Sequence, residues 1–546
     1  MMNNKVLVLA LDSATFDFIL PMVEEGALPN FDRLLKNGTH SLLDTTIPPH
    51  SAPAWITFMT GLNPGKHGVF GFNNMDLTDY NSMGSKVVNS SMYKGKTIFD
   101  YLSKKGKRVI SFGLPTTYPP WDINGIMMSG YPTPSERIAF TYPEHYGKQF
   151  GQLLDMKIDV KLASSYDVQI KGYHYENQRI TDIAIDLLRT EPWDLFVYFN
   201  GILDSVQHTF WQFKNKLAPT FNQSLADKYS NVIEDMYKAV DFSVGRILDA
   251  LDSNTTIFVV SDHGSGPRPL KTFNLNYWLN QKGYLRTSGK LKTKYSSLGY
   301  KTLNFLKAKL PVRDLYRKYF PSNLKKNISS IRHNIGSIDW EKTSAYRIEL
   351  TYPHEGINLN VKNRQPLGCV DISKYESIRS SIISELTDLK DPAKRERIIQ
   401  EAYRKEDLYN GSYLENIPDI IVKLNEEYEG GVGLDELISN GSKAGYKKWS
   451  GFHLPQGIFI TSGSNIIKNL KIKNVSIADV APTILYTLNE PVPKNMDGQV
   501  LTQIFNDGNH NIRYADFDQT ATDNKQDVLQ EDEERRRALK ALGYMD

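Results

Sequence analysis

Six aspartate and histidine residues could together bind metal ions. They are Asp12, Asp204, His208, Asp262, His263 and His453. Asp204 and His208 stand four residues apart, which places both side chains on one face of a helix. Imidazole nitrogen and carboxylate oxygen are the ligands of zinc-type catalytic sites that keep one position open for a substrate. A single residue of this kind is more often a core, surface or capping residue, so the case depends on how the fold places all six.

Ser51 stands at the start of a predicted helix within residues 46–71. Pro53 follows two positions later, and proline is tolerated in the first turn of a helix, where its missing N–H removes no internal bond. Such a helix would aim backbone N–H groups and a positive dipole end at the serine hydroxyl, an arrangement that binds phosphate readily. The same position suits an ordinary N-cap serine. This stretch alone leaves both interpretations open.

Three predicted strands bring several of these residues to a common edge. Continuous apolar runs, typical of parallel strands buried on both faces, occur at residues 6–10, 193–200 and 255–260. The first run ends at Asp12 and the third at Asp262, and the segment with Asp204 directly follows the second. Ligands bind beyond the carboxyl ends of strands in open α/β sheets. Helical segments alternate with these strands, so we expect a doubly wound α/β fold, with a mostly parallel sheet and helices on both faces.

Further elements are expected along the chain. Helical periodicity covers residues 18–36 and 227–251. Residues 118–135 are rich in proline and glycine and are expected to form a loop over one edge of the sheet. Residues 531–544 are expected to form a terminal helix.

Composition restricts the class of protein. The chain has 546 residues, enough for a large core and more than one domain, and a formal net charge of +3, too small to indicate a nucleic-acid-binding protein. Cys369 is the single cysteine, which excludes an internal disulfide framework and a cysteine-rich zinc site and fits a reducing compartment. No apolar stretch approaches the ~20 residues that span a bilayer, and no signal-peptide cleavage pattern follows the first apolar run. Cytoplasmic residence is therefore expected.

The alternation of strands and helices loosens in the middle of the chain. We expect residues 1–264 and 450–505 to form the α/β core, residues 265–449 to form an inserted cap or substrate region over its active edge, and residues 506–546 to form a polar tail with the terminal helix. Within the insertion, residues 286–332 are strongly basic, with Asp314 as the one acid. A solvated helical face, a cap over an anionic substrate, and a contact with an anionic partner such as acidic lipid or nucleic acid all remain open.

Seven motifs resemble those of a known family. In order they read LALDSATFD, PPHSAPAWITFMTGLNPGKHGVFGF, GLPTTYPPW, LDSVQH, VVSDHG, GFHLPQG and ADVAPTILYTLNEPVPKNMDG. The sequence resembles the alkaline phosphatase superfamily, in its type I phosphodiesterase/nucleotide pyrophosphatase group, and especially the bacterial and archaeal branch labelled predicted phosphohydrolase or phosphomutase. The motifs bracket nearly the whole core, whereas residues 265–449 are covered much less specifically.

The resemblance implies two divalent metal ions, for which zinc suits the ligands and manganese or magnesium are alternatives. Carried over to this sequence, the ligands of one ion are Asp204, His208 and His453, and those of the other are Asp12, Asp262, His263 and Ser51. Ser51 would also be the nucleophile, because a nearby dication favours the alkoxide form of its hydroxyl. Two ions about 4 Å apart can stabilise both the attacking and the leaving oxygen of an in-line displacement.

Two departures from the family's patterns leave the substrate open. Nucleotide pyrophosphatases usually have a threonine nucleophile with an asparagine three residues later, and here those positions are Ser51 and Ala54. Asn73 is a loose match to a further phosphate-binding asparagine of that group. Sulfatases require an arginine where Trp55 stands, which argues against sulfatase activity.

Several basic residues near the motifs are candidate substrate contacts. Lys66 and His67 follow the Ser51 helix, and Arg268 closely follows SDHG; surface packing or an exposed turn would explain each of them as well. His354 and Arg364 are candidate contacts from the insertion.

We therefore expect a metal-dependent phosphohydrolase that acts on a small-molecule phosphate ester through a serine nucleophile, most closely a phosphodiesterase or nucleotide pyrophosphatase. A phosphomutase or phosphomonoesterase with the same site is the first alternative. A non-catalytic binding protein on this fold is the second, and the presence of every expected ligand speaks against it. The oligomeric state and the natural substrate cannot be inferred from the sequence.

Overall fold

The computed structural model describes the chain at residues 4–74, 77, 80, 86–134, 139–150, 165–288, 338–506, 508, 511–517, 535, 536 and 539. Most of the basic stretch at residues 286–332 lies outside these ranges. Of the expected terminal helix at residues 531–544, positions 535, 536 and 539 are described, and all three are helical.

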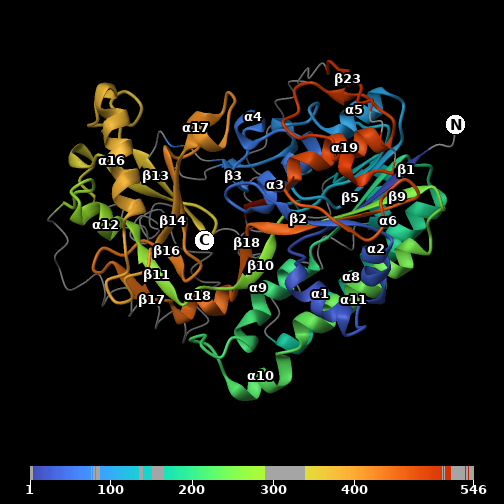
Figure 1. Cartoon of the computed structure of the whole chain (residues 1–546), viewed down its shortest axis with the longest axis horizontal. Coiled ribbons are helices and arrows are strands. Elements are labelled where there is room, and N and C mark those ends of the chain that lie inside the picture. Colours follow the sequence, from blue (N-terminus) through green and yellow to red (C-terminus); the bar gives the residue numbers. More distant parts are fainter. Residues whose placement is uncertain are drawn as a thin grey trace.

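A ten-stranded sheet forms the centre of the molecule (Figure 1). Its strands lie in the order β20 (Leu470–Lys471), β2 (Gly38–Asp44), β19 (Gln456–Ser462), β9 (Thr255–Val260), β1 (Lys5–Leu11), β8 (Leu195–Asn200), β5 (Val109–Phe112), β6 (Gly125–Met128) and β7 (Thr141–Tyr142), with β21 (Val475–Ser476) beside β2. Neighbours from β9 to β6 are parallel, whereas β19 is antiparallel to both β2 and β9 and β7 is antiparallel to β6. The sheet is therefore mostly parallel, as expected.

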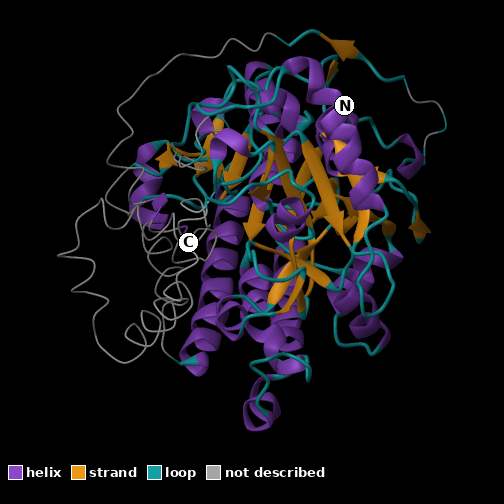
Figure 2. Cartoon of the chain, turned by 90° about the vertical axis from the view of Figure 1, so that its left-hand side faces the viewer, coloured by secondary structure: helices purple, strands orange, loops and turns teal. Residues whose placement is uncertain are grey.

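Helices cover both faces of this sheet. Alternate residues of β1 enter different cores, since Leu7 and Leu9 belong to one hydrophobic cluster while Val6 and Val8 belong to another. The first cluster is closed by α1 (Phe16–Glu24), α2 (Pro29–Lys36), α8 (Tyr166–Thr190), α9 (Ile202–Lys214) and α11 (Val232–Leu248). The second is closed by α3 (Ser51–Thr60), α5 (Ile98–Lys104) and α19 (Val480–Thr487). Figure 1 shows the two groups below and above the sheet, and Figure 2 shows the strands with helices around them. The doubly wound α/β fold is confirmed.

Smaller sheets stand beside the central one. One is the pair β10 (Gly264–Pro267) and β18 (Gly451–Leu454), a second is β16 (Tyr428–Gly431), β11 (Lys271–Asn274) and β17 (Ile438–Asn440), and a third is β12 (Ala345–Glu349), β13 (His354–Leu359), β15 (Ile420–Leu424) and β14 (Ile399–Arg404). The third sheet buries one face against α12 (Leu275–Gln281) and α16 (Tyr375–Thr387). Its other face packs against the two segments on either side of α3, since Tyr346 and Ile348 share a hydrophobic cluster with Ile47 and Phe70.

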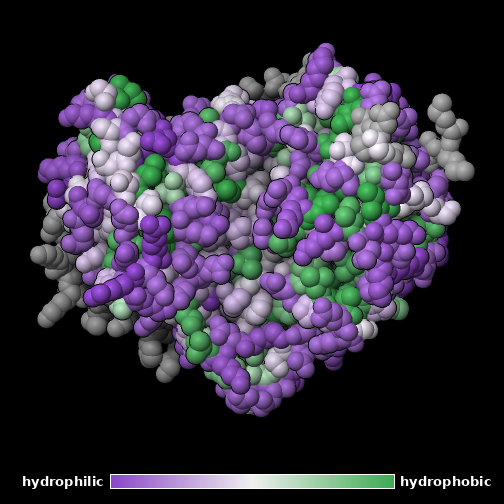
Figure 3. Space-filling model, in the orientation of Figure 1, coloured by the Kyte–Doolittle hydropathy of each residue, from purple (hydrophilic) through white to green (hydrophobic). Residues whose placement is uncertain are grey.

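The remaining elements are short. They are the helices α4 (Pro64–His67), α6 (Gly147–Phe150), α10 (Gln223–Tyr229), α17 (Lys405–Leu408) and α18 (Lys443–Lys448), the 3-10 helices η1 (Ser90–Met92), η2 (Glu144–Tyr146), η5 (Trp340–Lys342), η6 (Ile372–Lys374), η7 (Leu414–Asn416), η8 (Ile477–Asp479) and η9 (Thr502–Ile504), and the pairs β3 (Asn73–Asn74) with β4 (Lys86–Val87) and β22 (Val492–Pro493) with β23 (Tyr514–Ala515). Within the described ranges, no helix is long and apolar enough to cross a membrane. The face in Figure 3 is mostly hydrophilic with smaller hydrophobic areas.

Three expected elements differ from the structure. The helix predicted at residues 18–36 is two helices, because Gly26 adopts a left-handed φ of 74° and Pro29 starts α2 without an N–H to donate. The helix predicted at residues 227–251 is likewise divided between α10 and α11. The loop predicted at residues 118–135 contains the strand β6. Its apolar side chains pack into the hydrophobic clusters on the two faces of the sheet, despite the surrounding prolines and glycines.

Candidate active site

The carboxyl ends of three adjacent strands meet at one place. β9, β1 and β8 are parallel neighbours, so the residues after each strand lie at the same edge. Asp12 follows β1, Asp262 and His263 follow β9, and α9 begins two residues after β8. The side chains of Asp12, Asp262 and His263 are fully buried. The sequence predicted that these residues meet at the edge of the sheet where ligands bind, and the structure places them there.

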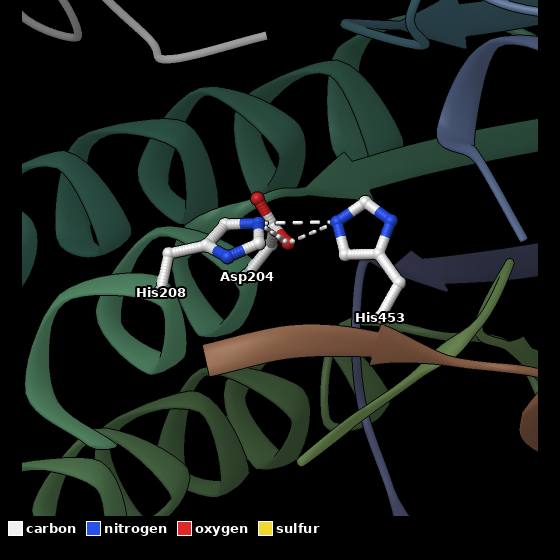
Figure 4. A group of neighbouring side chains, drawn as sticks. All are labelled: Asp204, His208 and His453. Atoms are coloured by element: carbon white, nitrogen blue, oxygen red, sulfur yellow. Dashed lines mark hydrogen bonds and ion pairs between the residues drawn. The ribbon is translucent and has the colours of Figure 1, made fainter. Parts of the chain in front are cut away.

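Asp204, His208 and His453 form one group of potential metal ligands (Figure 4). The helical spacing in α9 puts Nε2 of His208 3.0 Å from Oδ1 of Asp204. Nε2 of His453 lies 3.1 Å from the same His208 atom and 3.5 Å from that carboxylate oxygen. β18 supplies His453 because it directly precedes β19, which runs antiparallel to β9 and so begins at the edge where β9 ends.

Asp12, Asp204 and His263 form a second group, with one ligand atom of each within 4.8 Å of the others. Nε2 of His263 lies 3.6 Å from Oδ1 of Asp12 and 3.3 Å from Oδ2 of Asp262. The His263 and His453 rings stack with their centroids 3.7 Å apart, which joins the two groups. Asp204 thus belongs to both groups.

Ser51 is the first residue of α3 and is not its cap. His50 is the N-cap, and its Nδ1 atom accepts a hydrogen bond of 3.2 Å from the N–H of Ala52. The Ser51 hydroxyl instead lies 3.1 Å from Nε2 of His263 and is fully buried. The N-cap interpretation of Ser51 is therefore wrong, because the neighbouring histidine does the capping.

The same capping changes what α3 can offer a phosphate. The N–H of Ala52 is bonded to the His50 ring, the N–H of Ala54 is bonded to the His50 carbonyl at 3.1 Å, and Pro53 has none. Among the described residues, only the N–H of Ser51 is left without a partner in this first turn. The helix contributes its dipole and one donor, rather than the larger cradle expected from the sequence.

Each histidine in the site forms a hydrogen bond from its Nδ1 atom to a backbone carbonyl. The carbonyls are those of Gly451 for His208 at 2.7 Å, Pro49 for His453 at 3.0 Å and Gly264 for His263 at 3.1 Å. A carbonyl can only accept, so each Nδ1 carries the proton and each Nε2 presents a lone pair. This pattern is typical of metal-binding histidines, whose second nitrogen is fixed by a hydrogen bond.

The buried carboxylates also fit a cation. Oδ1 of Asp12 and Oδ2 of Asp262 are buried and accept no hydrogen bond from any residue that the structure describes. Such atoms are costly to bury unless something positive lies beside them. The Nε2 lone pairs and these oxygens together make a donor set suited to divalent ions.

Burial governs the titration of the site. It raises the pKa of Asp12 well above its ordinary value, with added repulsion from Asp262, and it raises the pKa of Asp262 to about 7. Burial acts in the same direction on Asp204, but positive charge at the His208 and His453 side would outweigh it and lower the pKa of Asp204 well below its ordinary value. Burial lowers the pKa of the His263 imidazole, which keeps the ring neutral. Carboxylates that resist ionisation alone are stabilised as anions by a bound cation.

Sequence reasoning missed three residues that contact the site. Ser13, in a left-handed conformation with φ of 63°, places its hydroxyl 3.0 Å from Oδ1 of Asp204. The Tyr131 hydroxyl donates a 3.1 Å hydrogen bond to Oδ2 of Asp12. Trp449 stacks on the His208 ring with centroids 3.8 Å apart. Ser13 could have been suspected, since it follows Asp12 directly, but no local pattern marks the other two.

The three candidate substrate contacts near the motifs, Lys66, His67 and Arg268, have other partners. Lys66 donates to Oδ1 of Asp497 at 2.5 Å. His67 is buried, with Nδ1 accepting from the N–H of Val69 and Nε2 bonded to the Thr57 hydroxyl; burial lowers its pKa to about 3. Arg268 makes a two-point ion pair with Glu429, at 2.6 and 3.0 Å. None of these interactions favours a substrate role, which stays a prediction.

Comparisons with known proteins identify the family. Residues 6–430 match the family model described as type I phosphodiesterase/nucleotide pyrophosphatase, so the chain belongs to this family. The family is metal-dependent, and its members are hydrolases that act on phosphate esters. The resemblance inferred from the motifs is confirmed, and the protein is an enzyme of this class.

Solved structures of two relatives are similar to the chain. Human ectonucleotide pyrophosphatase/phosphodiesterase 5 is 14% identical, with 92% of this chain and 100% of that chain covered and a TM-score of 0.47. The murine protein of the same name, in a structure with AMP, is 13% identical, with 89% and 95% covered and a TM-score of 0.47. The search of curated proteins gives no match.

Proposed function

We propose that the protein is a phosphodiesterase in which Ser51 is the nucleophile and two divalent ions, zinc in the first instance, complete the site. The observation that carries the proposal is the position of the Ser51 hydroxyl, 3.1 Å from Nε2 of His263 and at the start of α3. His208, His453 and Asp204 would hold one ion. Asp12, Asp262 and His263 would hold the other.

Two bound divalent ions would supply charge stabilisation for an in-line displacement and would favour the alkoxide form of Ser51. The Ser51 hydroxyl gives its proton to solvent, and its oxygen forms a bond to phosphorus while the bond from phosphorus to the leaving alcohol breaks. That alcohol leaves with a proton from solvent. Water then cleaves the serine ester and restores the Ser51 hydroxyl. His50 supports the first step by capping α3. Because His50 accepts the hydrogen bond at the start of the helix, the oxygen of Ser51 is not needed as a capping acceptor.

The surrounding residues keep the ligands in place. Backbone carbonyls hold the three histidines with Nε2 turned inward, and Tyr131 occupies one oxygen of Asp12 so that the other faces His263. Full burial of Ser51 and the carboxylates excludes bulk water, which strengthens each electrostatic interaction at the reacting group.

Activity on bis(4-nitrophenyl) phosphate tests the assignment. Ser51→Ala should lower kcat by roughly 10³-fold or more, because it removes the nucleophile, while the metal content of the purified protein stays at about two divalent ions per chain. Thr60→Ala, at the far end of α3, is the matched control and should keep activity. Wild-type turnover by Ser51→Ala would overturn the role of Ser51.

A substrate panel tests the reaction class. Aryl diesters should be preferred to aryl monoesters, and no phosphoryl group should return to a sugar phosphate. A clear preference for monoesters, or transfer back to the substrate, would replace the diesterase with the phosphomonoesterase or phosphomutase alternative. The contact of residues 286–332 with an anionic partner remains a separate prediction.

A further inference from the structure

Ser13 is a buried serine in a backbone conformation that serine rarely adopts. It follows Asp12 at the end of β1, is 1% exposed and has a left-handed φ of 63°. Glycine adopts this conformation freely, whereas a residue with a Cβ atom is strained in it. Strained residues cluster at functional sites, so a serine kept where glycine would fit with less strain needs a functional reason.

All the polar groups of Ser13 face residues of the candidate active site or its supporting helix. Its N–H lies 3.4 Å from Oδ1 of Asp262, and its carbonyl accepts a 2.9 Å hydrogen bond from the Gln207 amide. Its hydroxyl lies 3.0 Å from Oδ1 of Asp204 and 3.2 Å from Nδ1 of His263. Ser13 therefore joins the end of β1 to the end of β9 and to α9.

The two hydroxyl contacts fix where the hydrogen atoms lie. An ionised Asp204 can only accept, so the Ser13 hydroxyl donates to it. Its single hydrogen is then used, and the Ser13 oxygen accepts from Nδ1 of His263. The same nitrogen faces a second acceptor, the Gly264 carbonyl, at 3.1 Å. Both contacts require the proton on Nδ1, which leaves the Nε2 lone pair 3.1 Å from the Ser51 hydroxyl.

These contacts form a continuous path from the nucleophile to a carboxylate. The path runs from the Ser51 hydroxyl through the His263 ring and the Ser13 hydroxyl to Asp204. Asp204 belongs to both groups of potential metal ligands, and Figure 4 shows it beside the two histidines of the first group. Ser13 thus connects the ligands assigned to one ion with a ligand assigned to the other.

The His263 ring needs this support more than the other two histidines do. The rings of His208 and His453 donate to carbonyls that are 243 and 404 positions away in the sequence, at 2.7 and 3.0 Å. The carbonyl that faces His263 belongs to the next residue and lies at 3.1 Å, so it moves with the same turn of the chain. The Ser13 hydroxyl is the contact that ties Nδ1 of this ring to a different strand.

We propose that Ser13 is a positioning residue, whose hydroxyl holds the His263 ring with Nε2 turned towards Ser51 and towards the ion on the Asp12 side. Its left-handed conformation is kept because it delivers the hydroxyl to this place. The inference rests on the proposed two-metal diesterase and adds a residue that controls one ion separately from the other.

The effect of Ser13 should fall on one ion. Asp204 keeps its contacts with His208 and His453, at 3.0 and 3.5 Å, when the Ser13 hydroxyl is removed. The ion of these three residues therefore depends little on Ser13. The ion on the Asp12 side loses the support of its single histidine, and lost partners of ligating groups typically lower metal affinity by about 10–100-fold.

Two substitutions separate the hydroxyl from the backbone. Ser13→Ala and Ser13→Gly both remove the hydroxyl, but only glycine relieves the left-handed strain. In the metal-free protein, the Tm of Ser13→Gly should be about 2 °C higher than that of Ser13→Ala. Metal binding should not follow this difference. In both variants the affinity for one ion should fall by about tenfold, and the affinity for the other should stay within about twofold of the wild type.

Competition with a chromophoric chelator measures both affinities, with Zn²⁺ as the probe and without turnover. Excess Zn²⁺ should restore most of the kcat on bis(4-nitrophenyl) phosphate, because the Ser51 nucleophile is intact. Ser111→Ala is the matched control. It removes the hydroxyl of another fully buried serine, on β5, that has no partner among the described residues, and it should leave both affinities unchanged.

The outcomes separate this inference from the proposed function. Wild-type affinity for both ions in Ser13→Ala and Ser13→Gly would overturn the role of Ser13 and leave the diesterase intact. An affinity that follows Tm, higher in the glycine variant than in the alanine variant, would overturn it too, as would an equal loss of both ions. A wild type that binds two ions without turning over any diester would overturn the diesterase alone. A wild type that binds no divalent ion would overturn both.

Discussion

The Nε2 atoms of His208 and His453 lie 3.1 Å apart, and both present lone pairs because each ring donates through Nδ1 to a backbone carbonyl. Two lone pairs at this distance repel each other unless a cation lies beside both. Asp204, 3.0 and 3.5 Å from these atoms, completes a three-ligand set. The geometry of this pair thus depends on a positive charge that the side chains themselves do not supply.

Removing one member of this pair should release one ion. We expect His453→Ala to bind about one divalent ion in place of two and to lose activity by at least about 100-fold, because the remaining two ligands leave that ion undercoordinated. Elemental analysis of the purified protein and turnover of an aryl diester check both values. His174→Ala, on the exposed side of α8, is the control and should change neither. Full metal content in His453→Ala would contradict the assignment.

Gly451 links β18 to α9 and leaves no room for a side chain. A Cβ atom there would overlap Trp211 and the carbonyl of Gln207, and the Gly451 carbonyl holds His208. Gly451→Ala should therefore destabilise the protein by about 2 kcal/mol and weaken metal binding, as measured by urea unfolding and metal titration. Gly508→Ala, where nothing lies within 4 Å, should be neutral. An unchanged metal affinity in Gly451→Ala would show that the carbonyl does not orient His208.

Much of the site could be predicted because it follows from regular structure. Asp12 and Asp262 end adjacent parallel strands, and parallel strands bring their carboxyl ends to one edge. Asp204 and His208 share a helix face through their spacing. Each of these relationships needs only the local period of a strand or helix.

The rest depends on contacts between segments far apart in the sequence. Tyr131 reaches Asp12 across 119 positions, and no spacing rule connects them. His453 enters the site because β19 is antiparallel, whereas its apolar pattern alone fits either direction. The sequence does not predict β6, because its three consecutive apolar residues are outweighed by the prolines and glycines around them. The partner of Arg268 could not be predicted for a related reason, since Glu429 is 161 residues away.

Asp419 gives the four-stranded sheet a pH-dependent support. Its buried carboxylate accepts hydrogen bonds from Arg364 and from Lys405. Burial opposes ionisation, but these two cations prevail and lower the pKa of Asp419 below its ordinary 3.8. The stabilisation is therefore present above pH 3.8 and is lost as the pH falls through the lowered pKa. Asp419→Asn should reduce the free energy of unfolding by roughly 3 kcal/mol near neutral pH.

Urea unfolding over a pH series checks this prediction. The difference between wild type and Asp419→Asn should shrink as the pH falls from 3.8 through the lowered pKa, at which the carboxylate of the folded wild type becomes protonated. Asp388→Asn changes an exposed aspartate of the same region and should show little difference at any pH. A penalty for Asp419→Asn that is constant across the series would mean that its charge does not support the sheet.

Tyr131 should control how tightly the Asp12 side of the site binds metal. Its hydroxyl occupies Oδ2 of Asp12, which leaves Oδ1 facing His263. Tyr131→Phe removes the donor but keeps the ring, so the fold should persist while the metal affinity of that side falls by about tenfold, as for other partners of ligating carboxylates. Competition with a chromophoric chelator measures the affinity, and excess metal should restore activity. Tyr93→Phe, which removes a buried hydroxyl bonded to the Thr116 carbonyl, is the matched control. Equal affinities in wild type and Tyr131→Phe would show that Asp12 is oriented without this hydrogen bond.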